Sequence, residues 1–193
     1  MKIGLFFGTF NPVHLGHVEI VYRLLNKNIF NQIWIILTPR SPHKNFNLVR
    51  KEHRLQMLNI AFEDYKKVII SDVEFNLKEP NYTINTLTYL EANFPKYNFS
   101  IIMGSDNFLK IKTWKNSSKI IDEHNIYVYP REGCRITNNM HDKNVNYLNF
   151  PKVKISSTLI RDEIICKGKD TEQYLPSAIY EYIKSHHLYS TLA

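Results

Sequence analysis

The sequence GTFNPVHLGH, residues Gly8 to His17, stands between an apolar run, Ile3 to Phe7, and an amphipathic segment, Val18 to Leu25. A strand that leads through such a stretch into a helix places unpaired N–H groups and the positive end of the helix dipole at one corner. Phosphate groups bind well there. His14 and His17 are three residues apart, which puts both imidazoles on one side of a helical turn. The stretch therefore predicts an anion site.

Histidines at the start of a helix can also have a purely structural role. A lone histidine near a helix start commonly caps the helix or lies at the surface, whereas the paired H-x-G-H spacing after a Gly-Thr turn favours a ligand. Gly8 allows the backbone to approach that ligand closely, and Pro12 and Gly16 fit the turn and the helix entry. Neither the dinucleotide pattern G-x-G-x-x-G nor the P-loop pattern occurs in the chain.

Further along the chain, apolar runs alternate with segments of helical periodicity. The predicted strands are 33–37, 68–75, 99–103 and 126–129, and the predicted helices are 51–62, 82–94 and 177–185. Strands that alternate with helices through short connections predict an α/β fold, with a doubly wound, mainly parallel sheet and helices on both faces. Ligands gather at the carboxyl ends of the strands in such sheets.

Polar or glycine-containing stretches follow several of these strands. Gly8-Thr9, the loop from Pro39 to Lys44 and Gly104-Ser105-Asp106 come directly after apolar runs, so we expect them to line one crevice. Asp106 fits either an acceptor for ribose hydroxyls or an N-cap for the segment 107–112. Trp114 fits either a core position or a platform that stacks on a flat ring.

The sequence ISSTLIR, Ile155 to Arg161, reads as the start of another helix, because hydroxyl side chains precede an apolar run. Its hydroxyls fit ordinary capping. A helix N-terminus with Arg161 beside it also makes a clamp for a terminal phosphate. The polar segment from Arg131 to Asn144 is predicted to be a surface loop without evident chemistry.

Composition narrows the class of protein. The chain has 193 residues, enough for one sizeable core, and a formal net charge of +7, which suits a nucleotide or nucleic acid. Its lysines are scattered, however, so a solvated basic surface explains most of them. Cys134 and Cys166 form no C-x-x-C pair, which argues against a zinc site and a disulfide framework and for a cytoplasmic location. No apolar run approaches the ~20 residues of a membrane helix, and the first run lacks a signal-peptide cleavage site.

Taken together, these motifs resemble the bacterial nicotinate mononucleotide adenylyltransferases, of the H-x-G-H nucleotidyltransferase superfamily, over nearly the whole chain. The resemblance rests on GTFNP, H-x-G-H, Pro42-His43-Lys44, Tyr82-Thr83, Gly104-Ser105-Asp106, Thr113-Trp114 and ISSTLIR. Asn11 departs from the Asp found in much of the superfamily, and Ser41 stands where a second proline is more usual. The resemblance implies a Rossmann-like fold with one nucleotidyltransferase domain over 1–193, in which 155–193 form a C-terminal helical portion.

The family implies transfer of the adenylyl group of ATP to nicotinate mononucleotide, which gives nicotinate adenine dinucleotide and pyrophosphate on the route to NAD. The catalytic residues implied are His14, His17 and Lys44. The ATP-binding residues implied are Gly8, Thr9, Phe10, Gly104, Asp106, Ser156, Ser157 and Arg161. The residues implied for nicotinate mononucleotide are Thr83, Trp114 and Lys115. Mg²⁺ would be held mainly by the ATP phosphates, with no metal ligand from the protein, and a homo-oligomer is possible.

Two other functions compete with this one. Another adenylyl- or cytidylyltransferase of the superfamily, for example one that acts on phosphopantetheine, shares the phosphate motifs, but Trp114 and the Pro42-His43-Lys44 loop favour a nicotinate ligand. A basic nucleic-acid-binding module would fit the charge and the 12 tyrosines. The aromatic residues do not interleave with Lys and Arg on one evident surface, however, and we therefore expect neither nucleic acid nor membrane as a partner.

Overall fold

The computed structural model describes residues 1–40, 48–134, 143–167 and 171–189. Six strands form one sheet in the order β3-β2-β1-β4-β5-β6, and each pairing is parallel. The strands are β1 (Lys2–Gly8), β2 (Gln32–Leu37), β3 (Val68–Ser71), β4 (Asn98–Gly104), β5 (Asn125–Tyr129) and β6 (Val145–Tyr147). The chain reverses its direction of strand addition between β1 and β4, as in doubly wound sheets. The prediction of a mainly parallel Rossmann-like sheet is confirmed.

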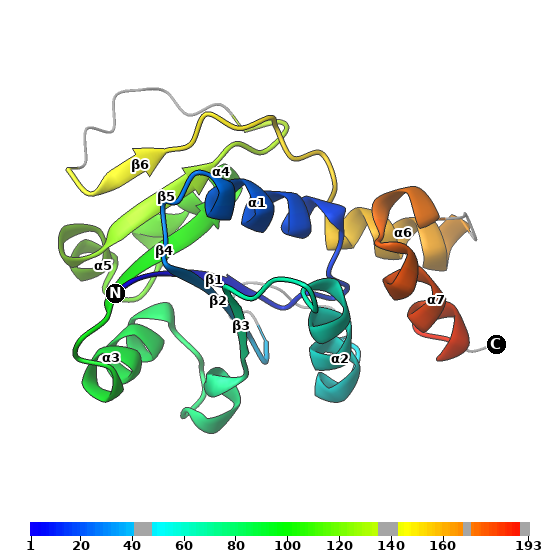
Figure 1. Ribbon diagram of the computed structural model, residues 1–193, viewed down its shortest axis with the longest axis horizontal. Helices are drawn as coiled ribbons and strands as arrows, with labels where there is room; N and C mark the ends of the chain where they lie inside the picture. The colour runs from blue at the N-terminus through cyan, green and yellow to red at the C-terminus, as the bar shows by residue number, and fades with distance from the viewer. Residues whose placement is uncertain (41–47, 135–142, 168–170, 190–193) are drawn as a thin grey trace.

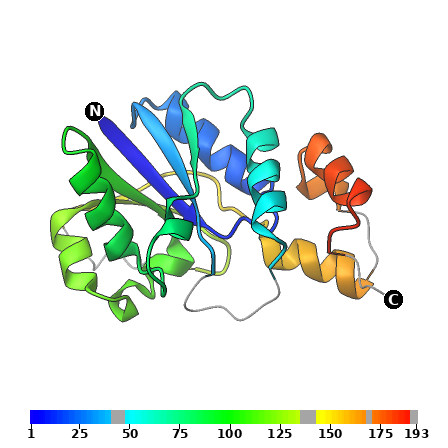
Figure 2. The same ribbon diagram turned by 90° about the horizontal axis from the view of Figure 1, so that it is seen from below.

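Helices cover both faces of the sheet (Figure 2). The helices are α1 (Leu15–Asn26), α2 (Lys51–Ala61), α3 (Thr83–Asn93), α4 (Ser105–Phe108), α5 (Ser117–Glu123), α6 (Ser157–Lys167) and α7 (Ser177–Ser185). Successive side chains of a strand point to opposite faces, so β1 sends Phe6 into a core with α1, α2 and α7, and Leu5 into a second core with α3, α4 and α5. Strands buried on both faces read as unbroken apolar runs for this reason.

Three elements differ from the sequence prediction: one helix start, one strand end and one additional strand. The first helix begins at Leu15, so His17 lies inside it rather than ahead of it. The predicted strand 68–75 ends at Ser71 and continues as a 3-10 helix, Val73–Asn76, because the Ser71 hydroxyl and the Asp72 carbonyl accept local backbone N–H groups and turn the chain. Strand β6 was not predicted, since three partly exposed residues show no apolar alternation.

The C-terminal helices lie at the end of the molecule away from β6 (Figure 1). Ile160, Ile179 and Ile183 are nevertheless part of the same buried cluster as Met57 of α2. The Tyr182 hydroxyl and His53 Nδ1 are 2.9 Å apart, which joins α7 to α2. Among the described residues, no helix is both long and apolar enough to cross a membrane.

Candidate active site

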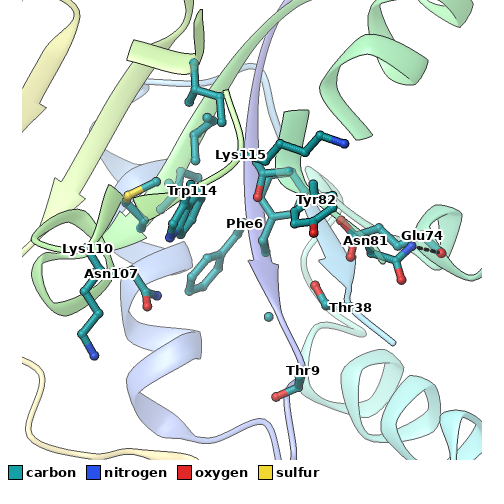
Figure 3. A pocket seen from close by; sticks show the side chains of 18 of the residues that line it. Phe6, Thr9, Thr38, Glu74, Asn81, Tyr82, Asn107, Lys110, Trp114 and Lys115 are labelled. Atoms are coloured by element: carbon teal, nitrogen blue, oxygen red, sulfur yellow. Dashed lines mark hydrogen bonds between the residues drawn. The ribbon is translucent and has the colours of Figure 1, made fainter. Parts of the chain in front are cut away.

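The carboxyl ends of β1, β2, β4 and β5 meet at one pocket (Figure 3). Gly8, Thr9 and Gly104 line it as expected, together with Thr38, whereas Pro39 and Arg40 of the predicted loop do not. The further part of the predicted crevice, 41–44, lies outside the described residues, and so does the predicted catalytic Lys44. Ser105 and Asp106 do not line this pocket.

The two histidines of H-x-G-H lie face to face at the start of α1. Their rings stack with centroids 3.7 Å apart, and His17 Nδ1 accepts the backbone N–H of His14 at 3.3 Å. Because Nδ1 accepts, the proton of neutral His17 is placed on Nε2. The glycine of the motif is required for this packing: a Cβ at Gly16 would lie 2.8 Å from Val153 Cγ1 and 3.1 Å from the His14 ring. The prediction that both imidazoles share one side is confirmed.

His14 is 1% exposed, and its Nδ1 has no hydrogen-bond partner among the described residues. Burial first, and then the neighbouring charges of His17 and Arg131, hold the pKa of His14 well below its usual value. Histidine donates most strongly to phosphate when protonated, whereas the burial of His14 favours its neutral form. An anionic ligand that raises the His14 pKa would have to supply the opposing charge.

The glycine turn at the end of β1 is shaped by the ring of Phe10. Phe10 has a positive φ of 44° and is 2% exposed, with its ring 4.9 Å from that of His17. A Cβ at Gly8 would lie 3.0 Å from the Phe10 ring. The absence of a side chain at Gly8 therefore leaves room for the Phe10 ring. The sequence suggested only that Gly8 allows a ligand to approach the backbone.

Arg54 of α2 holds two of the strand ends in place, and sequence reasoning missed it. Its guanidinium donates to four backbone carbonyls: Val49 at 3.0 Å, Thr9 at 3.1 Å, Thr38 at 2.9 Å and Pro39 at 3.3 Å. At 3% exposure these bonds are sheltered from water. Nothing in the periodicity of 51–62 distinguishes Arg54, although an arginine on the buried side of an amphipathic helix was the available signal.

Asn11 is fully buried and joins the first motif to the end of the chain. Its Oδ1 accepts from Val49 N at 3.1 Å and from the Tyr189 hydroxyl at 2.9 Å. Its carbonyl accepts from Arg161 Nη1 at 2.6 Å. The Val49 N–H and the Tyr189 hydroxyl need only an oxygen that accepts. The amide oxygen of Asn11 supplies it without the negative charge of an aspartate.

The predicted C-terminal clamp lies against the same loop. The Ser157 hydroxyl donates to the Pro12 carbonyl at 2.8 Å, while Arg161 Nη2 donates to Thr158 Oγ1 at 3.2 Å. The Ser156 hydroxyl accepts from Leu159 N at 3.1 Å, so it also caps α6. The structure thus brings ISSTLIR to the loop between β1 and α1. This loop and the start of α1, residues 8–17, are called the anion corner below. The pocket itself is not lined by several predicted site residues: His14, His17, Phe10, Ser156, Ser157 and Arg161.

Thr83, Trp114 and Lys115, the residues predicted for the pyridine nucleotide, all line the pocket. Trp114 follows a short 3-10 helix, Ile111–Thr113, and Lys115 Nζ lies 4.7 Å from the centre of the Tyr82 ring. In Figure 3, Trp114 and Tyr82 lie on opposite sides of Phe6. The arrangement offers aromatic faces and a cation to a flat, anionic ligand.

Asp106 lies in the first turn of α4 and is not an N-cap, since the helix begins at Ser105 and Gly104 holds the cap position. The alternative N-cap role for 107–112 is therefore wrong. The Asp106 carboxylate is 42% exposed and lies 3.9 Å from Arg131 Nε. A Cβ at Gly104 would meet Asp106 Oδ1 and lie 3.0 Å from Arg131 Cγ and 3.2 Å from Tyr129 Cζ, so a side chain there would require these neighbours to move.

Arg131, placed by sequence in a loop without chemistry, connects three parts of the site. Its backbone N–H donates to Ser105 Oγ at 2.9 Å, and its side-chain Nη1 donates to the Ile155 carbonyl at 2.8 Å. It thus links the β4 turn to the segment before α6. No sequence pattern marks Arg131, because its partners are a side chain and a carbonyl far along the chain.

Glu74 is a buried carboxyl in the pocket wall that the sequence analysis did not notice. It is 2% exposed, its Oε1 accepts from Thr86 Oγ1 at 2.7 Å, and its carbonyl accepts from Asn81 Nδ2 at 2.6 Å. Burial raises the pKa of Glu74, against the hydroxyls of Thr86 and Thr38, which lower it. The described residues hold no group of three or more His, Cys, Asp or Glu side chains that could bind a metal.

The fold and this site define a nucleotidyltransferase-like α/β protein, and a family model described as cytidylyltransferase-like matches residues 5–163. A curated relative from Flavobacterium psychrophilum, named "Probable nicotinate-nucleotide adenylyltransferase", is 42% identical and covers 98% of this chain and 99% of its own. A relative of the same name from Bacteroides fragilis is 39% identical over 94% of this chain and 90% of its own. The chain belongs to the nicotinate-nucleotide adenylyltransferase family.

Solved structures share the fold. The nicotinic acid mononucleotide adenylyltransferase of Plasmodium falciparum, solved in complex with NaAD, superposes with a TM-score of 0.85 at 22% identity, covering 97% of both chains. At this identity the likeness supports the fold and carries no residue roles.

Proposed function

We propose that this chain transfers the adenylyl group of ATP to nicotinate mononucleotide, releasing pyrophosphate and forming nicotinate adenine dinucleotide in NAD biosynthesis. The observation that carries the proposal is a pocket whose Gly8–Thr9 edge adjoins the start of α1, so that two kinds of surface lie next to each other. The Gly8–Thr9 turn beside the stacked His14 and His17 is suited to phosphates, and Trp114 with Thr83 is suited to a flat pyridine ring. Family membership points to the same reaction.

The chemistry requires positioning rather than an activated side chain. The mononucleotide phosphate is itself the nucleophile and attacks the α-phosphorus of ATP in line, while the bond to the pyrophosphate oxygen breaks. Alignment of two bound reactants can lower the barrier by roughly 7–11 kcal/mol. His17 Nε2–H and the N-terminus of α1 would donate to the phosphate oxygens as charge moves onto the leaving group.

Other residues take supporting roles. Lys44 and Arg161 would neutralise phosphate charge, and Gly104 and Asp106 would hold the adenosine. Ser156 and Ser157 would complete the β- and γ-phosphate side through the start of α6. Mg²⁺ would be carried by the ATP phosphates, where it screens charge, because the donors around the anion corner are imidazoles and basic groups rather than the carboxylates that Mg²⁺ prefers.

The test is pyrophosphate release by the purified protein with ATP and Mg²⁺. Nicotinate mononucleotide, nicotinamide mononucleotide and phosphopantetheine are offered separately, and we expect the highest kcat/KM with nicotinate mononucleotide. Turnover of phosphopantetheine alone would keep the phosphate roles and overturn the ring site. Salt-dependent binding of RNA without turnover of any acceptor would instead support the nucleic-acid module. A cytoplasmic location and a homo-oligomer stay predictions.

A further inference from the structure

A row of pocket-lining residues runs along the segment between β4 and α5. Asn107, Lys110 and Thr113 are three residues apart, and all three line the pocket. The Lys110 N–H donates to the Asn107 carbonyl at 3.0 Å, and the Thr113 N–H donates to the Lys110 carbonyl at 2.9 Å. Backbone hydrogen bonds with this three-residue spacing align the side chains that they join. The local backbone therefore presents the row to the pocket as a unit.

The other side of the same segment is anchored in the core. Phe108 and Ile111 are each 1% exposed and belong to the buried cluster that also contains Ile120 and Val128. Their burial fixes the rotation of the segment about its axis, because a rotation would expose two large apolar side chains to water. The direction of Lys110 thus follows from core packing, although Lys110 itself is exposed.

Lys110 brings a positive charge to the pocket wall. Of the positions that the structure describes, none forms an ion pair or a side-chain hydrogen bond with its ammonium. Lys115, a second lysine that lines the pocket, instead lies over the Tyr82 ring at 4.7 Å from its centre. In Figure 3 the Lys110 side chain points away from Trp114, and its ammonium and Thr9 both lie below Trp114 in this view. The charge of Lys110 therefore suits an anion remote from a ring bound at Trp114.

We propose that Lys110 is a specificity-determining residue whose ammonium binds the phosphate of the acceptor mononucleotide. The inference rests on the proposed function and assigns a residue to the phosphate that acts as the nucleophile. Two phosphate-bearing substrates repel each other, so a cation beside the acceptor lowers the free energy of bringing them together. A lysine ammonium is a point charge with three donors on a flexible stem, which suits a phosphate that approaches from solvent.

The place of Lys110 in the pocket assigns it to the acceptor rather than to ATP. Lys110 and Trp114, the residue proposed to stack on the pyridine ring, are four residues apart and both line the pocket. Asp106 and Arg161, proposed for the adenosine and the triphosphate, do not line it. One short segment would thus contact both the ring and the phosphate of the same ligand.

The experiment combines removal of the ammonium with removal of the phosphate. Pyrophosphate release gives the KM for nicotinate mononucleotide and for ATP, and inhibition by nicotinate riboside, which lacks the phosphate, gives a Ki. For Lys110→Met we expect the KM for nicotinate mononucleotide to rise about fivefold. The kcat, the KM for ATP and the Ki of the riboside should each stay within about twofold of the wild type, because none of them depends on this contact.

Two further variants and a salt series separate the charge from a structural effect. Lys110→Arg keeps the charge, so its KM should stay within about twofold of the wild type. Lys112→Met is the matched control, since Lys112 is an exposed lysine of the same segment that does not line the pocket, and its KM should not change. The effect of Lys110→Met should also shrink at about 1 M salt, where charges are screened beyond roughly 3 Å.

Each other outcome overturns the inference. An unchanged KM for nicotinate mononucleotide in Lys110→Met shows that the ammonium does not bind the acceptor, and a raised KM for ATP alone places it at the triphosphate. An equal rise in the Ki of the riboside shows a contact with the ribose or the ring. An equal effect in Lys112→Met, or one that salt does not reduce, shows that the phosphate is not the partner. A wild type that prefers a different acceptor overturns the proposed function first and this inference with it.

Discussion

Single side chains set the chemistry of the anion corner. His17 accepts a backbone N–H at Nδ1 and so presents its other nitrogen as a donor, while His14 is packed beneath it with almost no exposure. The stacked pair therefore contains two different imidazoles: one ring is placed to donate to a phosphate, whereas burial holds the pKa of the other well below its usual value.

We expect His17→Ala to lower kcat by on the order of 10²–10³, the cost typical of one lost donor to transition-state charge. Steady-state pyrophosphate release measures it, and circular dichroism confirms the fold. His187→Ala, which removes an exposed imidazole beyond α7, should leave kcat unchanged. A loss below tenfold in folded His17→Ala would rule out the donor role.

His14 makes stability depend on pH. Its pKa in the folded protein is lowered, so below its ordinary value near 6.5 the unfolded chain binds more protons than the folded one. The His14 contribution is thus fully present above about pH 6.5 and is lost as the pH falls. Urea unfolding at pH 7.5 and 5.5 should show a larger loss in the wild type than in His14→Gln. The lowered pKa of His124 changes stability in the same direction, but His124 is present in both proteins, so its effect cancels in the comparison.

At the level of elements, helix α2 fixes the position of the strand ends that form the site. Arg54 lies on its buried side and fixes the ends of β1 and β2 through the carbonyls of Thr9 and Thr38. The ends of β1 and β2, which are also joined by the Thr38 N–H to the Gly8 carbonyl at 2.8 Å, are thereby held at one spacing, and the pocket presents both edges to a ligand.

Arg54→Met should destabilise the protein by about 3 kcal/mol or more, because four backbone carbonyls, one buried and three part-buried, lose their donor. Urea denaturation measures the loss. Lys119→Met is the control: Lys119 pairs with Glu123 on the surface, so its loss should cost no more than about 0.5 kcal/mol. Equal effects in the two variants would contradict the role given to Arg54.

Much of this arrangement was accessible from sequence, for identifiable reasons. Ile33 to Leu37 reads as a buried strand because burial on both faces leaves no room for polar residues, and the rule for strand ends then grouped Gly8 with Gly104. Arg54, Arg131 and Glu74 escaped because their partners belong to other elements or loops, which no local periodicity marks. A charged side chain buried by tertiary contacts has the same local sequence signature as an exposed one.

At the scale of the whole molecule, the two ends of the chain meet at Asn11. Tyr189 reaches it from the segment after α7, and Arg161 reaches it from α6, across separations of 178 and 150 residues. The C-terminal helices thus complete the anion corner besides covering one face of the core.

Tyr189→Phe should lower stability by about 1–2 kcal/mol, since a buried hydroxyl that bonds Asn11 is lost while the ring remains. Thermal unfolding measures the change, and Tyr22→Phe, at a 50% exposed position, should have almost no effect. We also expect a raised KM for ATP in Tyr189→Phe because the loop at Asn11 loosens. An unchanged KM together with unchanged stability would show that the contact is dispensable.

The convergence on Asn11 also fixes when the enzyme becomes competent during its synthesis. The ribosome makes the phosphate motif first, yet that motif gains the partners Arg161 and Tyr189 only when nearly the whole chain has emerged. A nascent or prematurely terminated chain can form β1 and α1 but leaves the amide of Asn11 without its C-terminal hydroxyl.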